Sequence, residues 1–254
     1  MKVTRSVIPN LFTISNLFCG FASMVHTIEH NYRLAAIMIV VGGIFDALDG
    51  VMARLTKSSS EFGVELDSLA DIVSFGVAPS LLVYNAVGAF INPPGMLLSA
   101  MPAICGALRL ARFNVQLVGF DKDYFRGLPI PSAAFLIVSY VYFYFDAASA
   151  NWMLNGTGLM SVTIGVSLLM VSTIKYETIP KFSKKSITAH PAVFTAFVAG
   201  LTITIATLGA AIFPLMVLYV VVGAVRSGVL YVRRRFDAEE IELDEDESAN
   251  EIVN

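Results

Sequence analysis

A series of apolar stretches, each close to the length that crosses a lipid bilayer as a helix, runs through most of this chain of 254 residues. A membrane-spanning helix needs about 20 predominantly apolar residues. Hydrophobic residues make up 56% of the sequence and the mean hydropathy is +0.71, far above an ordinary soluble domain. The sequence therefore predicts an all-α, polytopic membrane helix bundle.

We predict eight transmembrane helices and a short amphipathic helix at the interface before them. The interfacial segment is residues 1–10, with Lys2 and Arg5 toward anionic lipid and Pro9 beginning the next helix. Because no small-residue cleavage site follows, we expect the first apolar stretch to be kept as a membrane helix. The predicted spans are residues 11–29, 33–54, 65–90, 95–117, 130–148, 157–176, 191–208 and 210–232.

Basic residues predict the orientation of the spans. With the N-terminus in the cytosol, 16 of the 17 Lys and Arg residues fall inside and only Arg33 falls outside. Residues 1–236 are the predicted membrane domain. Residues 237–254 carry nine of the twenty acids and are predicted to be a disordered cytoplasmic tail. We therefore expect a multi-pass protein of the cell membrane with both termini on the cytoplasmic side.

Four aspartates interrupt the second and third apolar stretches: Asp46, Asp49, Asp67 and Asp71. Each costs about 2.5–3.5 kcal/mol at the centre of a membrane helix, so the group requires compensation. Asp46 and Asp49 are i,i+3 neighbours, and Asp67 and Asp71 are i,i+4 neighbours, so each pair shares a helix face. Two such faces turned together form a cage of oxygen ligands, which Mg²⁺ or Mn²⁺ prefers, and two cations would neutralise four acids.

Small residues and an arginine accompany these acids. Gly50 and Ala53 share the face of the first acidic pair and would let a bulky ligand approach the helix, while Arg54 could contact phosphate. Solvated, inert acids at helix ends would not require this spacing. The sequence therefore predicts a phosphate-handling site.

The pattern D-x2-D-G-x2-A-R-x8-G-x3-D-x3-D, from Asp46 to Asp71, resembles the hallmark of the CDP-alcohol phosphatidyltransferase family. The stretches PNLFTISNLFCG, ALRLARFN and GLPIPSAA resemble those of its integral-membrane phosphatidylserine synthase branch. The resemblance implies transfer of a phosphatidyl group from a CDP-activated lipid to an alcohol, with release of CMP, and commonly a homodimer. It implies no nucleic-acid partner.

The resemblance also assigns roles to individual residues. The implied metal ligands are Asp46, Asp49, Asp67 and Asp71, and Asp71 is the implied general base. The expected CDP-binding residues are Asn10, Thr13, Asp49, Gly50, Ala53, Arg54 and Gly63. For the polar stripe Asn10, Thr13 and Asn16, contact with the nucleotide and hydrogen bonding between helices remain equally open.

For the acceptor we predict L-serine. Its carboxylate needs a cation, and Arg109 and Arg112, spaced i,i+3 at the end of the fourth predicted span, could both point toward the site. Charge anchoring of these arginines at the membrane interface is the alternative. Glycerol 3-phosphate, inositol or choline as acceptor, and CDP-archaeol in place of CDP-diacylglycerol as donor, also agree with these residues.

Two other classes of protein remain as alternatives. A cation channel or transporter would also place acids inside the membrane, but Arg54 beside them would repel a permeating cation. A membrane scaffold would leave four buried aspartates without a purpose.

Overall fold

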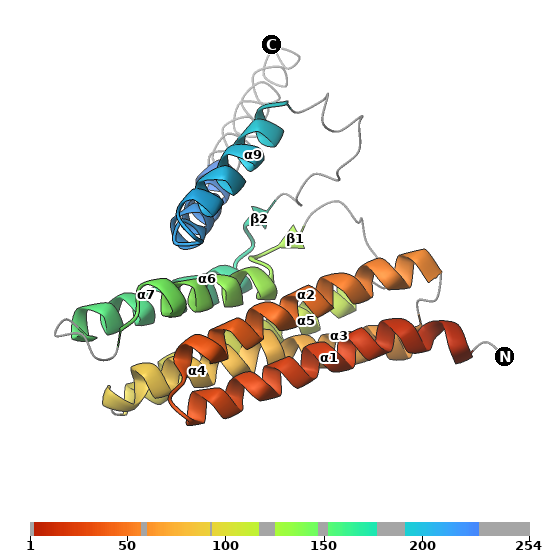
Figure 1. Ribbon diagram of the computed structural model, residues 1–254, viewed down its shortest axis with the longest axis horizontal. Helices are drawn as coiled ribbons and strands as arrows, with labels where there is room; N and C mark the ends of the chain where they lie inside the picture. The colour runs from red at the N-terminus through yellow and green to blue at the C-terminus, as the bar shows by residue number, and fades with distance from the viewer. Residues whose placement is uncertain are drawn as a thin grey trace, which may run out of the picture.

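The computed structural model describes residues 3–56, 60–91, 93–116, 125–146, 152–176 and 191–228. The predicted acidic tail, 237–254, lies outside the described residues. Within them the protein is a bundle of helices, as predicted, with one short strand pair (Figure 1). The helices are α1 (Val3–Ile28), α2 (Tyr32–Thr56), α3 (Glu61–Asp71), α4 (Ala78–Ala86), α5 (Pro94–Gln116), α6 (Ile130–Phe143), α7 (Trp152–Val171) and α9 (Pro191–Ala206), and a further helix covers Ile212–Gly228.

The first four predicted spans correspond to the four described helices that are long and apolar enough to cross a membrane. These are Val7–Ile28, Tyr32–Thr56, Glu61–Ala86 and Pro94–Val115. The described parts of three later apolar helices are shorter: Ile130–Phe143, Asn155–Val171 within α7, and Ile212–Gly228 have 10–17 residues each. A membrane protein of several spans is thus confirmed, whereas eight spans stays a prediction.

The N-terminal segment differs from its predicted form. The sequence predicts a separate interfacial helix over residues 1–10, with Pro9 beginning the next helix, but α1 runs from Val3 to Ile28 with Pro9 inside it. Pro9 lies in the second turn of this helix, where it has no N–H for the carbonyl four residues earlier and its ring crowds that carbonyl. The helix nevertheless continues through Pro9.

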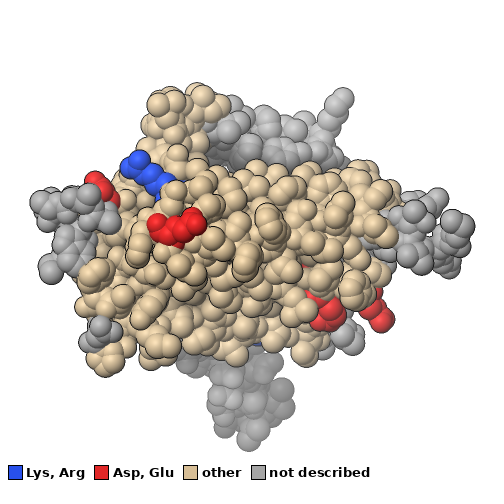
Figure 2. Space-filling view, turned by 60° about the horizontal axis from the view of Figure 1, so that its bottom comes forward, with Lys and Arg blue, Asp and Glu red and all other residues tan. Residues whose placement is uncertain are grey.

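Helix α1 is polar toward the bundle and apolar toward the outside. Its buried face carries Thr13, Asn16, Ser23 and Thr27, each at most 3% exposed. On its exposed face a large apolar side chain recurs every three or four residues: Val7, Leu11, Ile14, Phe18, Phe21, Val25 and Ile28. Figure 2 shows a broad face with almost no charged residues, the few present lying toward its ends. Lipid in contact with this face explains the arrangement.

The third span contains a π-helical segment, η1 (Ile72–Val77), between α3 and α4. The Ala78 N–H donates to the Val73 carbonyl five residues earlier, which is the wider π-helical turn. Three successive residues, Ser74 to Gly76, are buried there. The segment begins directly after Asp71. The wider turn therefore changes the direction in which the residues after Asp71 project, relative to Asp71 itself.

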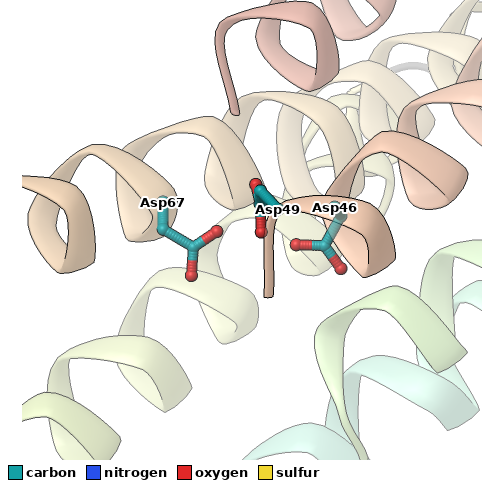
Figure 3. Close-up of side chains that lie close together, drawn as sticks. All are labelled: Asp46, Asp49 and Asp67. Carbon is teal, nitrogen blue, oxygen red and sulfur yellow. The ribbon is translucent and has the colours of Figure 1, made fainter. Parts of the chain in front are cut away.

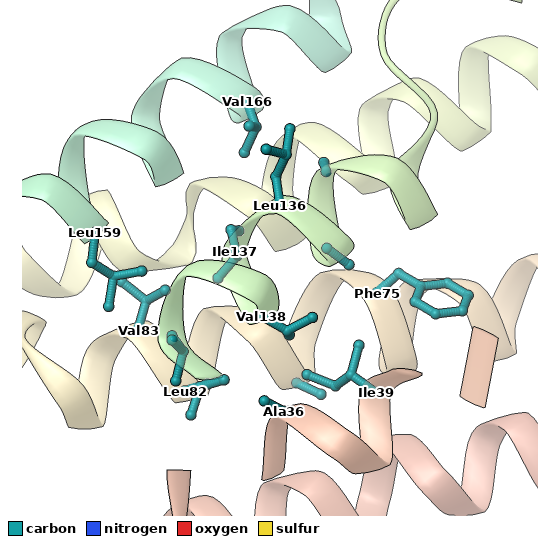
Figure 4. Close-up of a cluster of buried hydrophobic side chains, with 14 of the residues drawn as sticks. Ala36, Ile39, Phe75, Leu82, Val83, Leu136, Ile137, Val138, Leu159 and Val166 are labelled. Carbon is teal, nitrogen blue, oxygen red and sulfur yellow. The ribbon is translucent and has the colours of Figure 1, made fainter. Parts of the chain in front are cut away.

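The apolar core lies on the side of α2 and α4 that faces α6 and α7 (Figure 4). Its fully buried members include Ile39 of α2, Phe75 of η1, Leu82 of α4, Ile137 of α6 and Leu159 of α7. Beyond it, β1 (Phe125–Arg126) pairs with β2 (Lys175–Tyr176) in antiparallel register. This core fixes α2 and the third span against each other, and the acidic residues lie on these two elements.

Candidate metal and nucleotide site

The four aspartates come together where α2 faces α3. Asp46 and Asp49 lie on α2, and Asp67 and Asp71 lie on α3. Carboxylate oxygens of Asp46, Asp49 and Asp67 all lie within 4.8 Å of one another (Figure 3). Asp71, one turn after Asp67 on α3, is close enough to the other three acids to interact with their charges. Helical spacing thus brings both acidic pairs to one place, as the sequence predicts.

These carboxylates have the properties of a cation site. In the described part of the chain none of them forms a salt bridge, and Asp67 Oδ1 is buried without a hydrogen-bond partner. Asp49 is 7% exposed. Negative charges this close repel one another strongly away from water, and a bound cation would offset that repulsion. An all-oxygen set of this kind fits a hard divalent cation.

A pocket opens beside the aspartates, between α1, α2 and the start of α3. Its lining residues are Pro9, Asn10, Thr13, Asp49, Gly50, Ala53, Ser60, Gly63, Val64 and Asp67. A Cβ atom added to Gly50 would meet no atom within 4 Å, so this stretch of α2 faces open space. A ligand in the pocket would therefore touch the helix backbone and the carboxylates together.

Six of the seven predicted nucleotide-binding residues line this pocket: Asn10, Thr13, Asp49, Gly50, Ala53 and Gly63. Arg54 does not line it and is exposed on the last turn of α2. Their contacts with CDP remain predictions.

Three lining residues were not predicted: Pro9, Ser60 and Val64. The Ser60 hydroxyl accepts a hydrogen bond from the Gly63 N–H at 3.1 Å and caps α3. A serine directly before an acidic first turn is a helix-start signal, so Ser60 could have been found in the sequence.

The polar stripe of α1 reaches the acids directly. The Thr13 hydroxyl donates to Asp49 Oδ2 at 2.8 Å, and Asn16 Nδ2 donates to Asp71 Oδ1 at 3.5 Å. Ser74 Oγ in turn donates to the Asn16 carbonyl at 2.9 Å. Hydrogen bonding between helices, one of the two readings left open by the sequence, is therefore present.

The two arginines of α5 have different surroundings, although their spacing predicts that both could face the site. Arg109 is 6% exposed, and its Nε is buried with no hydrogen-bond partner among the described residues. Asp71 is the acid whose negative charge interacts with that of Arg109. Arg112 instead donates to the carbonyl of Val171 at 3.2 Å and to that of Ser172 at 3.4 Å. Arg109 belongs to the surroundings of the acids, whereas Arg112 binds the end of α7.

Comparison with known proteins agrees with this geometry. A family model described as CDP-alcohol phosphatidyltransferase matches residues 6–176. The CDP-diacylglycerol–serine O-phosphatidyltransferase of Helicobacter pylori is 42% identical over 181 residues, covering 69% of this chain and 73% of the relative. The Bacillus subtilis protein of the same name is 38% identical over 177 residues, covering 70% and 92%. The archaetidylserine synthase of Methanothermobacter thermautotrophicus is 38% identical over 184 residues, covering 70% and 73%.

Proposed function

The chain belongs to the CDP-alcohol phosphatidyltransferase family, and from that premise we propose that it transfers the phosphatidyl group of CDP-diacylglycerol to L-serine, giving phosphatidylserine and CMP. The observation that carries the proposal is the meeting of the carboxylate cluster with the pocket between α1, α2 and α3. A pyrophosphate there would lie against the acids, with its nucleoside in the pocket.

Family members depend on divalent metal in general, and Asp46, Asp49 and Asp67 could hold an ion. We propose two ions, Mg²⁺ or Mn²⁺, with Asp71 as the fourth ligand. When bound, they would offset charge on the pyrophosphate and on the departing CMP oxygen. The chain contributes the ligands, and the surrounding helices fix their positions.

Asp71 is the proposed general base. It takes the proton from the serine hydroxyl as the serine oxygen bonds to the phosphorus of the phosphatidyl group. The bond from that phosphorus to the CMP oxygen breaks, and its electron pair leaves with CMP. Asp71 lies at the end of α3, beside Asn16 of α1 and close enough to Arg109 to interact with its charge.

Arg109 is the proposed partner of the serine carboxylate. It is buried, and its Nε has no other partner in the described part of the chain. A hydrogen bond from a charged donor contributes about 1.5–3 kcal/mol. Arg109→Met keeps the apolar stem and removes the charge, so we expect it to raise the KM for serine about 10- to 100-fold with little change in the KM for CDP-diacylglycerol.

Arg112→Met is the matched control, because Arg112 binds carbonyls at the end of α7 instead. We expect it to lower the thermal stability and leave the KM for serine within a small factor of wild type. A normal KM for serine in Arg109→Met, in steady-state assays with varied serine, would contradict the proposed acceptor site.

The donor lipid and the acceptor are proposed from the relatives. Their names include both CDP-diacylglycerol–serine O-phosphatidyltransferase and archaetidylserine synthase. An ether-lipid donor such as CDP-archaeol is therefore the alternative donor, because the pocket would hold the CDP portion common to both. Glycerol 3-phosphate, inositol and choline are the alternative acceptors.

A cation transporter and a scaffold are the rival classes, and ligand-linked stability separates them from the enzyme. We expect Mg²⁺ or Mn²⁺ together with CMP to raise the melting temperature more than either alone, because the nucleotide phosphate and the acids share the ion. A scaffold would respond to neither ligand. A cation transporter would respond to the metal with no added effect of CMP, and that result would overturn the proposed function.

The protein is a membrane protein, and we propose that its site and both termini face the cytoplasm. The start of α1 and the junction of α2 with α3 lie at the same end of the bundle (Figure 1). The predicted distribution of basic residues assigns that end to the inner face. A homodimer is proposed by resemblance to the family.

A further inference from the structure

The hydroxyl of Thr13 points at a proposed metal ligand. Thr13 is 3% exposed, and its single proton is shared between Asp49 Oδ2 at 2.8 Å and the Pro9 carbonyl at 3.2 Å. The carboxylate is the nearer acceptor. A hydroxyl that donates to one carboxylate oxygen fixes the rotation of that group and leaves its other oxygen for a ligand.

Asn16 lies one turn further along the same face of α1 and is fully buried. Its Nδ2 donates to Asp71 Oδ1 at 3.5 Å. Its Oδ1 has no hydrogen-bond partner in the described parts of the chain and faces Gly42, where an added Cβ would lie 2.9 Å away. Turning the amide over would place its oxygen against the Asp71 carboxylate, so Gly42 and Asp71 together favour the observed orientation.

We propose that Thr13 and Asn16 are positioning residues, which hold Asp49 and Asp71 in the orientations that metal binding and proton transfer require. The inference rests on the proposed function, because it assigns these acids their roles. The two residues come from one helix, so α1 orients one acid of α2 and one acid of α3 at once. Ser74 Oγ, bonded to the Asn16 carbonyl, ties α1 to the segment that follows Asp71.

The same buried face of α1 supplies a comparison away from the acids. Thr27 is fully buried and its hydroxyl donates to the Ser23 carbonyl at 2.8 Å, within its own helix. Ser23 is also fully buried. A threonine or serine on this face that served only helix packing would behave like these two residues. Thr13 and Asn16 differ from them by their bonds to carboxylates.

Thr13→Val and Thr27→Val form a matched pair, because each removes one buried hydroxyl at nearly constant volume. The readout is the Mn²⁺ concentration that gives half of the maximal thermal stabilisation, with CMP present. We expect Thr13→Val to raise it about 10- to 100-fold, the usual effect of losing a group that orients a metal ligand. Thr27→Val should leave it unchanged, and Thr13→Ser, which keeps the hydroxyl, should restore most of the affinity.

Asn16→Ala and Ser23→Ala form the second pair, assayed by steady-state kinetics. We expect Asn16→Ala to lower kcat about 10- to 100-fold with little change in the KM for CDP-diacylglycerol, because Asp71 loses its orientation. Ser23→Ala should leave kcat near wild type. A kcat lowered equally in both variants would assign Asn16 to packing alone and overturn its part of the proposal.

The outcomes also separate this inference from the proposed function. A wild-type protein that Mn²⁺ and CMP do not stabilise would overturn the proposed function itself. A wild-type protein that they do stabilise, with equal Mn²⁺ dependence in Thr13→Val and Thr27→Val, would overturn only the positioning role of Thr13. We expect Mn²⁺ and CMP to stabilise the wild-type protein, and Thr13→Val to require a higher Mn²⁺ concentration for half of the maximal stabilisation.

Discussion

Asp71→Asn is expected to lower the rate of CMP release about 10²- to 10⁴-fold, because the amide cannot accept the proton of the acceptor hydroxyl. The oxygens of Asp71 lie outside the tight triad of Asp46, Asp49 and Asp67. The variant should therefore keep most of its stabilisation by Mn²⁺ with CMP. The measurements are single-turnover CMP release and thermal melting with both ligands.

Glu65→Gln is the control for this prediction, because Glu65 is an exposed acid on the same helix and lines no part of the pocket. It should keep wild-type turnover. An Asp71→Asn enzyme with normal turnover would refute the assignment of Asp71 as the base. A turnover lost together with all stabilisation by Mn²⁺ and CMP would assign Asp71 to metal binding alone.

Asp67→Asn is expected to change metal affinity and metal-free stability in opposite directions. Its Oδ1 is buried with no hydrogen-bond partner among the residues that the structure describes, and one of its carboxylate oxygens lies within 4.8 Å of oxygens of Asp46 and Asp49. Removing one negative charge should weaken Mn²⁺ binding on the order of 100-fold or more and abolish turnover. In the presence of a chelator the same change should raise the free energy of unfolding by about 1–3 kcal/mol, because it relieves repulsion.

The measurement is the melting temperature of Asp67→Asn and wild type in chelator and across an Mn²⁺ titration, with Glu65→Gln again as control. Plots of melting temperature against Mn²⁺ concentration should cross for the two proteins. The variant should have the higher melting temperature in chelator, and the wild type should have the higher one at saturating Mn²⁺. A variant that is less stable than wild type in chelator would show that the acids are not a repulsive cluster. That result would remove the physical argument for a cation between them.

Local spacing predicted the acidic cluster well. Asp46 and Asp49 share a face at i,i+3, as do Asp67 and Asp71 at i,i+4, so placing both pairs on helices already gave two acidic faces. Local spacing could not show that these two faces lie against each other, because that depends on how α2 and α3 pack. The open space beside Gly50 was also predicted from helical spacing, whereas Arg54, directly after Ala53, is exposed and does not line the pocket.

Contacts between distant segments could not be predicted in this way. Arg109 and Arg112 are equivalent by spacing, yet the partners of Arg112 are carbonyls about 60 residues later in the chain. The bond from Thr13 to Asp49 likewise joins residues 36 positions apart, so the sequence left two readings of the polar stripe open. Packing of the helices sets the partners of Arg112 and the bond of Thr13, whereas contact of the polar stripe with the nucleotide stays a prediction.

The π-helical segment Ile72–Val77 gave no signal either, because its apolar sequence is equally compatible with a regular helix. Pro9 misled in the opposite direction: it is a common first residue of a helix, yet here α1 begins six residues earlier. Both cases show the same limit of prediction from sequence. Helix propensity describes a residue in isolation, whereas packing within the bundle selects one of the backbone conformations that the residue can adopt.

CMP release tests the central claim most directly. Purified protein in detergent would receive CDP-diacylglycerol and Mn²⁺ or Mg²⁺, with L-serine, glycerol 3-phosphate, inositol and choline offered in parallel. We predict release with serine alone, lost on addition of chelator. Release with a different alcohol would keep the family's chemistry but contradict serine as acceptor. No release with any of the four, from protein shown to be folded and also supplied with CDP-archaeol, would contradict the proposed activity.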